Sequence, residues 1–297
     1  MSVDLTATST DRDDLASLEA GLDALESQQV RRTSGLARTF SAVWPPVLFF
    51  ALFLLVWELT YRSGVKPTYA LPSPADVALT LKQQLADGTL LHAMYTSLSH
   101  GVVGFGMSLV LGTALGLLMG TVRLVRRGIG PFVSGLQSLP SVAWVPASIL
   151  FFGFSNATIY TVILLGAVPS IANGMLSGID QVPPLWTRVG QVLGASGLQS
   201  VRFVLLPAAL PGYVGGLRQG WAFSWRSLMA AELIAHSPEF GVGLGQLLDT
   251  GRSNSDMPSV FAGILGIFVV GVAVELLFFA PVERRVLGRR GLGTVRR

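Results

Sequence analysis

The two lysines of this chain, Lys66 and Lys82, are the residues that a nucleotide-hydrolysing site would need, and their surroundings exclude one. A Walker-type phosphate-binding loop requires Gly-Lys-Ser/Thr, in which the lysine contacts the terminal phosphates. Here Val65 precedes Lys66 and Leu81 precedes Lys82. The chain therefore lacks this loop, and any ATP hydrolysis linked to it must take place on another protein.

The cysteine, histidine and serine patterns exclude further kinds of chemistry. The sequence has no cysteine and three histidines, His92, His100 and His236. None of the histidines has the His-Glu-x-x-His spacing of a zinc site. The segment Gly194-Ala195-Ser196-Gly197 also lacks the Gly-x-Ser-x-Gly spacing of a hydrolase nucleophile. We therefore expect no catalysis by this chain, no metal site and no cofactor.

Two charged residues, Arg226 and Glu232, lie in a strongly apolar segment and are candidate functional residues, because a charge buried in lipid is costly. They are six residues apart, so on a helix they point to different faces and cannot pair directly. Glu232 has two open interpretations: it lines the mouth of a pathway across the membrane, or it fixes a neighbouring helix. Arg226 could meet an anionic substrate, or it could pair with Glu275 or a backbone carbonyl.

A less apolar segment follows Asp180, and its composition predicts two short helices at the membrane surface. Gly194 would permit a sharp break between them, because glycine has no Cβ. Pro207 is predicted to end the second helix and to set the start of the next span. Such a knob could fit a groove on a cytosolic partner and move with it as a rigid body. The alternative is an ordinary surface loop.

The same segment resembles the EAA loop of bacterial ABC importer permeases. That pattern is Glu-Ala-Ala, three residues, Gly, nine residues, Ile, one residue, Leu-Pro. Here nine residues separate Gly194 from Val204, and Leu206-Pro207 follows one residue later. Arg188-Val189-Gly190 stands where the family has Glu-Ala-Ala. We call residues 188–207 the coupling loop, and its candidate residues are Arg188, Gly194, Ala195, Ser196, Val204, Leu206 and Pro207.

The resemblance extends from roughly Val43 to Arg290. Within the family, this chain is similar to the nitrate, sulfonate and taurine subgroup of permeases. Four separated features carry this subgroup assignment: Leu71-Pro72-Ser73-Pro74, Gly104-Phe105-Gly106, Leu139-Pro140 with Pro146, and Ala231-Glu232-Leu233-Ile234. The resemblance implies a permease that forms the translocation pathway for a small solute, such as a sulfonate, taurine or nitrate anion.

The resemblance also implies partners and a mechanism. The expected partners are a cytosolic ATP-binding-cassette ATPase dimer, an extracytoplasmic substrate-binding protein, a second permease copy forming a homodimer, and membrane lipid. The mechanism is alternating access driven by ATP binding to the ATPase pair. The alternative is a secondary transporter driven by an ion gradient. Residues 42–127 and 128–281 show no convincing internal repeat, and few acids are available for ion coupling.

Composition supports an all-α membrane protein. Hydrophobic residues make up 51% of the chain and charged residues only 13%. At about 20 apolar residues per span, five to seven spans can be accommodated. We predict a bundle of about six transmembrane helices at residues 42–59, 101–122, 130–152, 157–178, 212–234 and 258–281. We also predict a surface helix at 75–85, a turn at 153–156 and a loop at 235–257.

The distribution of charge predicts domains and orientation. Residues 1–35 are polar and acidic and are expected to form a disordered cytoplasmic tail, followed by a permease domain at 36–297. With both termini inside, fifteen basic residues lie on the cytoplasmic side and four outside, namely Arg62, Lys66, Lys82 and Arg252. The basic residues flank apolar spans, so they indicate a multi-pass membrane protein and no nucleic-acid partner. The resemblance to bacterial importer permeases implies that this membrane is the bacterial inner membrane.

Overall fold

The computed structural model describes residues 35–67, 70–235 and 241–288, with side chains from residue 44, and all regular structure in these ranges is helical. The predicted tail, apart from Gly35, lies outside the described residues, as do the last arginines. Contacts divide the chain at Trp57, so α2 (Gly35–Arg62) belongs largely to one part and the helices from α3 to α13 form the other. The segment Trp44–Arg62 is long and apolar enough to cross a membrane, which confirms the first predicted span.

A short amphipathic helix, α3 (Pro74–Ala86), begins where the sequence predicts it. Its N-cap is Ser73, whose Oγ accepts a hydrogen bond of 3.0 Å from the Asp76 N–H. Pro74 occupies the first turn, where its missing N–H leaves no bond unmade. The Leu71-Pro72-Ser73-Pro74 sequence is therefore a turn combined with a helix start.

Three long helices form the centre of the second part: α4 (Thr89–Thr121), α7 (Asn156–Asp180) and α10 (Leu206–Ile234). Glycines allow them to approach closely, since helices in lipid associate mainly by packing. A Cβ added at Gly112 of α4 would lie 2.7 Å from Ile171 Cβ, and one at Gly116 would lie 2.7 Å from the Ala172 carbonyl oxygen. The glycines spaced by four on α4 therefore face α7.

The prediction of a single third span at 130–152 is wrong, because the structure has two helices there. These are α5 (Arg123–Ser138) and α6 (Trp144–Phe152), joined through the short 3₁₀ turn η1 (Ser141–Ala143) and bent by 95°. Leu139 is extended, with φ −78° and ψ 134°. Pro140 disfavours the helical conformation for the residue before it, so the helix stops there instead of kinking.

The predicted turn before α7 is confirmed, whereas the predicted loop after α10 is only partly right. Gly153 has φ +66° in the predicted turn, and α7 begins directly after it. The predicted loop at 235–257 is partly wrong, because it contains the helix α11 (Leu244–Ser253). Leu244, Leu247 and Leu248 have helical spacing, which is the signal that could have found it.

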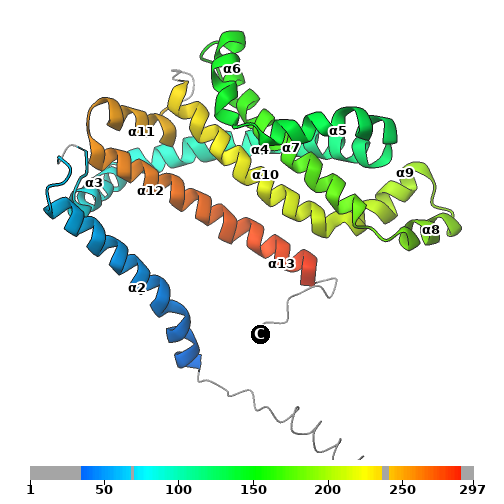
Figure 1. Cartoon of the computed structure of the whole chain (residues 1–297), viewed down its shortest axis with the longest axis horizontal. Coiled ribbons are helices and arrows are strands. Elements are labelled where there is room, and N and C mark those ends of the chain that lie inside the picture. Colours follow the sequence, from blue (N-terminus) through cyan, green and yellow to red (C-terminus); the bar gives the residue numbers. More distant parts are fainter. Residues whose placement is uncertain (1–34, 68–69, 236–240, 289–297) are drawn as a thin grey trace, which may run out of the picture. The chain divides into compact units, whose positions relative to one another are not determined.

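The last predicted span is confirmed and extends further than expected. It comprises α12 (Met257–Val274), the π-helical turn η4 (Glu275–Phe279) and α13 (Ala280–Gly288). Five helices of the described residues can cross a membrane, or six if the bent pair α5–α6 counts as one span, which agrees with the prediction of about six. Figure 1 shows α7 lying alongside α10, with α4 passing behind them.

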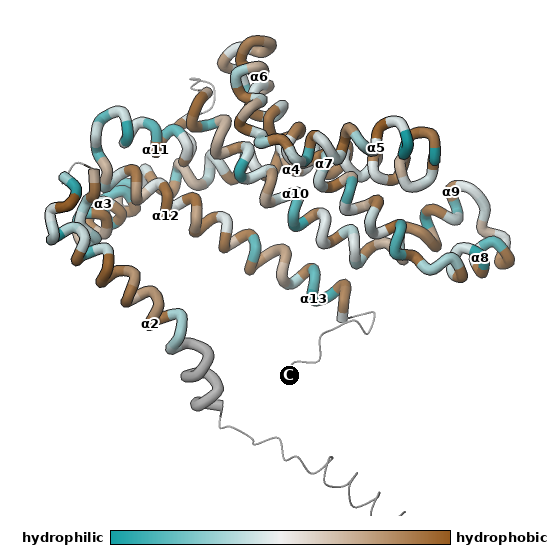
Figure 2. The backbone as a smooth tube through the Cα atoms, in the orientation of Figure 1, coloured by the Kyte–Doolittle hydropathy of each residue, from teal (hydrophilic) through white to brown (hydrophobic). Residues whose placement is uncertain are grey.

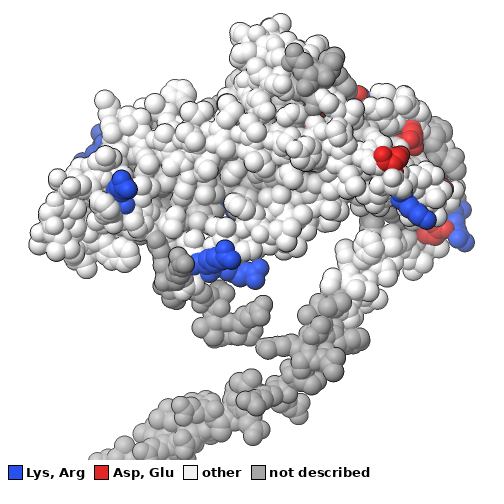
Figure 3. Space-filling view, turned by 180° about the vertical axis from the view of Figure 1, so that it is seen from behind, with Lys and Arg blue, Asp and Glu red and all other residues white. Residues whose placement is uncertain are grey.

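Hydropathy and charge follow this arrangement. In Figure 2 hydrophobic residues predominate along α12 and α6, whereas hydrophilic residues gather on α8 (Pro184–Val192) and α11. Figure 3 shows a broad face without Lys, Arg, Asp or Glu, with charges toward its edges. An uncharged band of this kind is what the hydrocarbon core of a bilayer requires.

Candidate functional site

The coupling loop contains a sharp reversal at Gly194. Gly194 has φ +87°, in the left-handed region that glycine adopts without a steric penalty. The N–H of Ala195 bonds the Gly190 carbonyl at 2.9 Å, and the N–H of Gly194 bonds the Gln191 carbonyl at 3.0 Å. This pair of bonds is the Schellman motif that closes a helix C-terminus. The structure thus places the end of α8 and the break in the loop at Gly194.

The second half of the coupling loop requires a correction at Pro207, which does not end a helix. After Ser196 the chain forms α9 (Gly197–Ser200), the π-helical turn η2 (Val201–Leu205) and α10, together one helical stretch from Gly197 to Ile234. Pro207 cannot donate the usual backbone bond. The wider turn just before it, where the Leu206 N–H reaches the Val201 carbonyl, accommodates the proline without a break.

Two motif positions of the coupling loop have a packing role. A Cβ at Gly190 would lie 2.7 Å from Val204 Cγ2, so only a very small residue fits where α8 crosses η2. Leu206 packs against the buried cluster formed by Met175, Ile179 and Ala209. Through these contacts the loop is held against α10 and α7.

The outer surface of the coupling loop is apolar and exposed. Arg188 and Ser196 are exposed, and Ala195 is partly exposed. Val192 is 88% exposed and Leu193 81%. Further exposed apolar side chains in this region are Leu185, Trp186, Val189, Leu198 and Phe203. Such a surface can bury apolar area against a partner protein.

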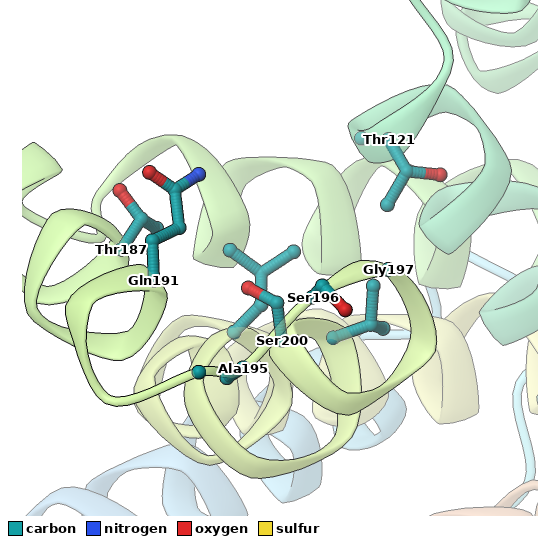
Figure 4. Close-up of a pocket in the computed structure, with 11 residues that line it drawn as sticks. Thr121, Thr187, Gln191, Ala195, Ser196, Gly197 and Ser200 are labelled. Atoms are coloured by element: carbon teal, nitrogen blue, oxygen red, sulfur yellow. The ribbon is translucent and has the colours of Figure 1, made fainter.

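A cleft of ≈ 680 Å³ lies between the coupling loop and the end of α4. Figure 4 shows Thr187 and Gln191 of α8 around the same opening as Ser200 of α9 and Thr121 of α4. Their hydroxyl and amide groups line it together with Gly194, Ala195, Ser196 and Gly197. Val201 and Leu205 also line it, so the coupling loop has an apolar outer surface and an inner side of mixed polar and apolar groups.

Two groups of ion pairs that sequence reasoning missed connect the helices, one near the coupling loop and one at the middle of α10. Arg126 of α5 donates two hydrogen bonds of 2.7 Å to Asp180 at the end of α7. Arg218 of α10 pairs with Glu275 at 2.5 Å and with Glu283 at 3.2 Å. Bidentate and shared pairs of this kind fix helix positions more firmly than single exposed pairs.

The described ion pairs join Glu275 to Arg218 and not to Arg226. The side chain of Arg226 is exposed. Its Nε donates to the Ala222 carbonyl at 3.0 Å, and its guanidinium lies 4.6 Å from the centre of the Phe223 ring. Of the partners that the sequence left open for Arg226, the structure shows the backbone carbonyl.

Glu232 is 1% exposed and bonds to neighbouring helices. Its Oε2 accepts a hydrogen bond of 2.7 Å from Ser97 Oγ of α4 and one of 3.0 Å from the Gly245 N–H of α11. Its Oε1 lies 3.7 Å from His100 Nδ1. In this structure the carboxylate therefore lies between three helices and away from any open surface, which fits a residue that fixes a neighbouring helix.

Comparison with known proteins gives one family match and several similar relatives. Residues 108–287 match the family described as binding-protein-dependent transport system inner membrane component. The protein SsuC of Bacillus subtilis (strain 168), whose name assigns it to aliphatic sulfonates transport as a permease, is 30% identical over 241 residues, covering 81% of this chain and 86% of SsuC.

The names of two further relatives state other transported solutes. The taurine transport system permease protein TauC of Escherichia coli (strain K12) is 29% identical, covering 84% of this chain and 86% of TauC. The nitrate import permease protein NrtB of Synechocystis sp. is also 29% identical, covering 82% of this chain and 88% of NrtB.

The fold is similar to that of a solved structure of the MetNI methionine ABC transporter in an inward-facing conformation. The TM-score is 0.52 at 20% identity, and the match covers 66% of this chain and 95% of the other. At this identity the likeness concerns the fold alone.

Proposed function

Because this chain belongs to the family of binding-protein-dependent transport system inner membrane components, and so is the permease subunit of an ABC importer, we propose that it forms the translocation pathway for a small anion. The observation that carries the function is the family match over residues 108–287 together with the permease relatives that span most of the chain. Membership in this family also favours an importer permease over a secondary transporter.

The proposed substrate class is a sulfonate, taurine or nitrate. Three relatives of similar identity have names for aliphatic sulfonates, taurine and nitrate. These solutes share a small anionic group with several oxygen atoms. Arg226 stays a proposed contact for such an anion, because its guanidinium is exposed and bonded only to a carbonyl and a ring among the described contacts.

The proposed partners are a cytosolic ATPase dimer, an extracytoplasmic substrate-binding protein and a second copy of this chain. The coupling loop supports the first of these. Its spacing from Gly194 to Leu206-Pro207 resembles that of the EAA loop, and its exposed side chains offer the apolar area that a docked protein would cover. ATP binding would close the ATPase pair, and the coupling loop would move with it.

Energy coupling is the first test of this proposal. Uptake should stop when the partner ATPase is disabled by mutation, because this chain has no Walker-type loop. It should persist when proton and sodium gradients are collapsed while ATP is maintained. The measurement is labelled-solute uptake in cells or proteoliposomes that contain the full complex. Uptake that follows an ion gradient would argue for a secondary transporter.

Topology gives the second test. The proposed orientation places both termini and the coupling loop in the cytoplasm. Lys82 on α3 and Arg127 on α5 are both exposed, and the chain has no native cysteine. We expect Lys82→Cys to react with an impermeant thiol reagent in intact cells and Arg127→Cys to react only after lysis. The opposite pattern would place the coupling loop outside, where no cytosolic ATPase could reach it.

A further inference from the structure

The buried carboxylate of Glu232 completes the start of a helix to which it does not belong. The first N–H groups of any helix have no intrahelical partner, and the N-cap side chain usually accepts one of them. The N-cap of α11 is Gly243, which has no side chain. Side chains of two other helices replace the missing cap. Glu232 Oε2 of α10 accepts from the Gly245 N–H at 3.0 Å, and Ser97 Oγ of α4 accepts from the Leu244 N–H at 2.8 Å.

These bonds form one connected group. Ser97 Oγ receives the Leu244 N–H and donates its own hydrogen to Glu232 Oε2 at 2.7 Å. A carboxylate near the positive end of a helix is also favoured by the helix dipole. We call Ser97, Glu232 and the N–H groups of Leu244 and Gly245 the α11 clamp.

The two glycines beside the clamp permit the close approach that it needs. A Cβ at Gly243 would lie 2.5 Å from Glu232 Oε2, and a Cβ at Gly245 would lie 2.5 Å from Glu232 Cβ. Any larger residue would push α11 away from α10. The Gly243-x-Gly245 spacing is therefore explained by the close packing of α11 against Glu232.

Glu232 also lies at the far end of the segment that begins in the coupling loop. The helical stretch Gly197–Ile234 has 38 residues, which at 1.5 Å per residue spans roughly 57 Å. Figure 1 shows α8 and α9 near one end of α10 and α11 near the other. Arg218 and the α7 contacts hold the middle of this stretch. A displacement at the coupling loop would thus reach Glu232 through one continuous helix.

We infer that Glu232 is a positioning residue that ties α11 to the outer end of α10, so that α11 moves with the segment that starts at the coupling loop. This inference rests on the proposed function for its role in transport, but not for the clamp itself. Glu232 performs this role by accepting two hydrogen bonds through its Oε2 atom. This role requires neither the negative charge of Glu232 nor a contact between Glu232 and the solute.

The clamp is tested by thiol labelling of Leu247→Cys in the otherwise cysteine-free chain. Leu247 is 9% exposed and belongs to the core cluster beneath α11. In the complex reconstituted in lipid nanodiscs, Glu232→Ala should raise its labelling rate by a hydrophilic maleimide about tenfold, because the Gly245 N–H loses its partner. Glu232→Gln should stay within about twofold of the parent, since the amide oxygen can accept both bonds.

A matched pair of serines on α4 supplies the control. Ser97 donates to Glu232, whereas Ser99 donates to the Thr96 carbonyl of its own helix at 2.7 Å. Ser97→Ala should raise Leu247→Cys labelling, and Ser99→Ala should leave it unchanged. Labelling that does not respond to Glu232→Ala or Ser97→Ala would overturn the clamp.

The transport role is tested on the same variants without the added cysteine. Glu232→Ala should lower uptake about tenfold while ATP hydrolysis without solute stays within about twofold, and Glu232→Gln should restore uptake. If Glu232→Gln abolishes uptake while labelling stays at the parent rate, the charge itself is needed and the inference is overturned. Labelling requires neither ATP nor solute. If no ATPase co-purifies, the proposed function fails, and the clamp is still decided by the labelling rates of this chain reconstituted alone in nanodiscs.

Discussion

Replacing Gly194 with proline should abolish uptake while the protein still reaches the membrane in normal amount. Gly194 has φ +87°, and proline fixes φ near −65°. The substitution also removes the N–H that bonds the Gln191 carbonyl at 3.0 Å. Since α8 would be redirected against α9, the surface offered to a partner would change. We expect a loss in uptake of at least about tenfold, as expected for a substitution that the native backbone cannot accommodate.

Two comparisons isolate the coupling loop in this experiment. Gly64 has φ +67°, and its N–H bonds the Tyr61 carbonyl at 3.3 Å, so Gly64→Pro imposes the same backbone change in another loop. It should leave ATPase recovery unchanged. Gly194→Asn should retain more uptake than Gly194→Pro, because asparagine tolerates the left-handed conformation. The measurements are membrane abundance, co-purification of the ATPase and uptake on the same samples. Normal ATPase recovery and uptake with Gly194→Pro would contradict a coupling role for this loop.

Replacing Gly216 with valine should prevent the central helices from packing. Gly216 of α10 faces Gly174 of α7, and a Cβ at either position would overlap the backbone of the other. The next glycine pair on these helices is similar, since a Cβ at Gly212 would lie 2.8 Å from Gly178 Cα. Rigid backbone cannot move aside as a flexible side chain can. We expect destabilisation of about 3 kcal/mol or more and a large loss of folded protein.

The adjacent residue gives a nearly ideal control for this substitution. Gly215 is exposed and has no atom within 4 Å of an added Cβ. Gly215→Val and Gly216→Val change helix propensity equally, so any difference between them reports packing against α7. Thermal unfolding in detergent and membrane abundance are the measurements. Equal stability of the two variants would show that α7 and α10 do not cross at Gly174 and Gly216.

Much of the fold could be predicted because a membrane imposes its constraints locally. A long apolar segment without charges favours a place in lipid, and residues 128–179 contain no charged residue. The turn at Gly153 and the start of α3 at Ser73 were predictable from turn and cap residues that act over a few positions. The family could be predicted from the spacing between Gly194 and Leu206-Pro207, since spacing along the chain is preserved in the sequence itself.

Several boundaries could not be predicted, because proline acts according to its surroundings. Pro140 ends α5 and produces a bend of 95°, whereas Pro207 lies inside a helical stretch of 38 residues. In the second case a π-helical turn absorbs the missing bond. Nothing in either local sequence distinguishes these outcomes. The surroundings differ, since Leu206, next to Pro207, packs against a buried cluster that includes Met175 and Ile179 of α7.

The sequence by itself determined that this chain is a multi-pass helical permease with a surface loop broken at Gly194, because apolar length, charge placement and motif spacing are all properties of the linear chain. Only the tertiary structure decided what its charged residues do. Arg218 and not Arg226 meets Glu275, and Glu232 accepts hydrogen bonds from α4 and α11. Ser97 is 135 residues away from Glu232. Partners at such separations are chosen by how the helices pack, and no local pattern records that choice.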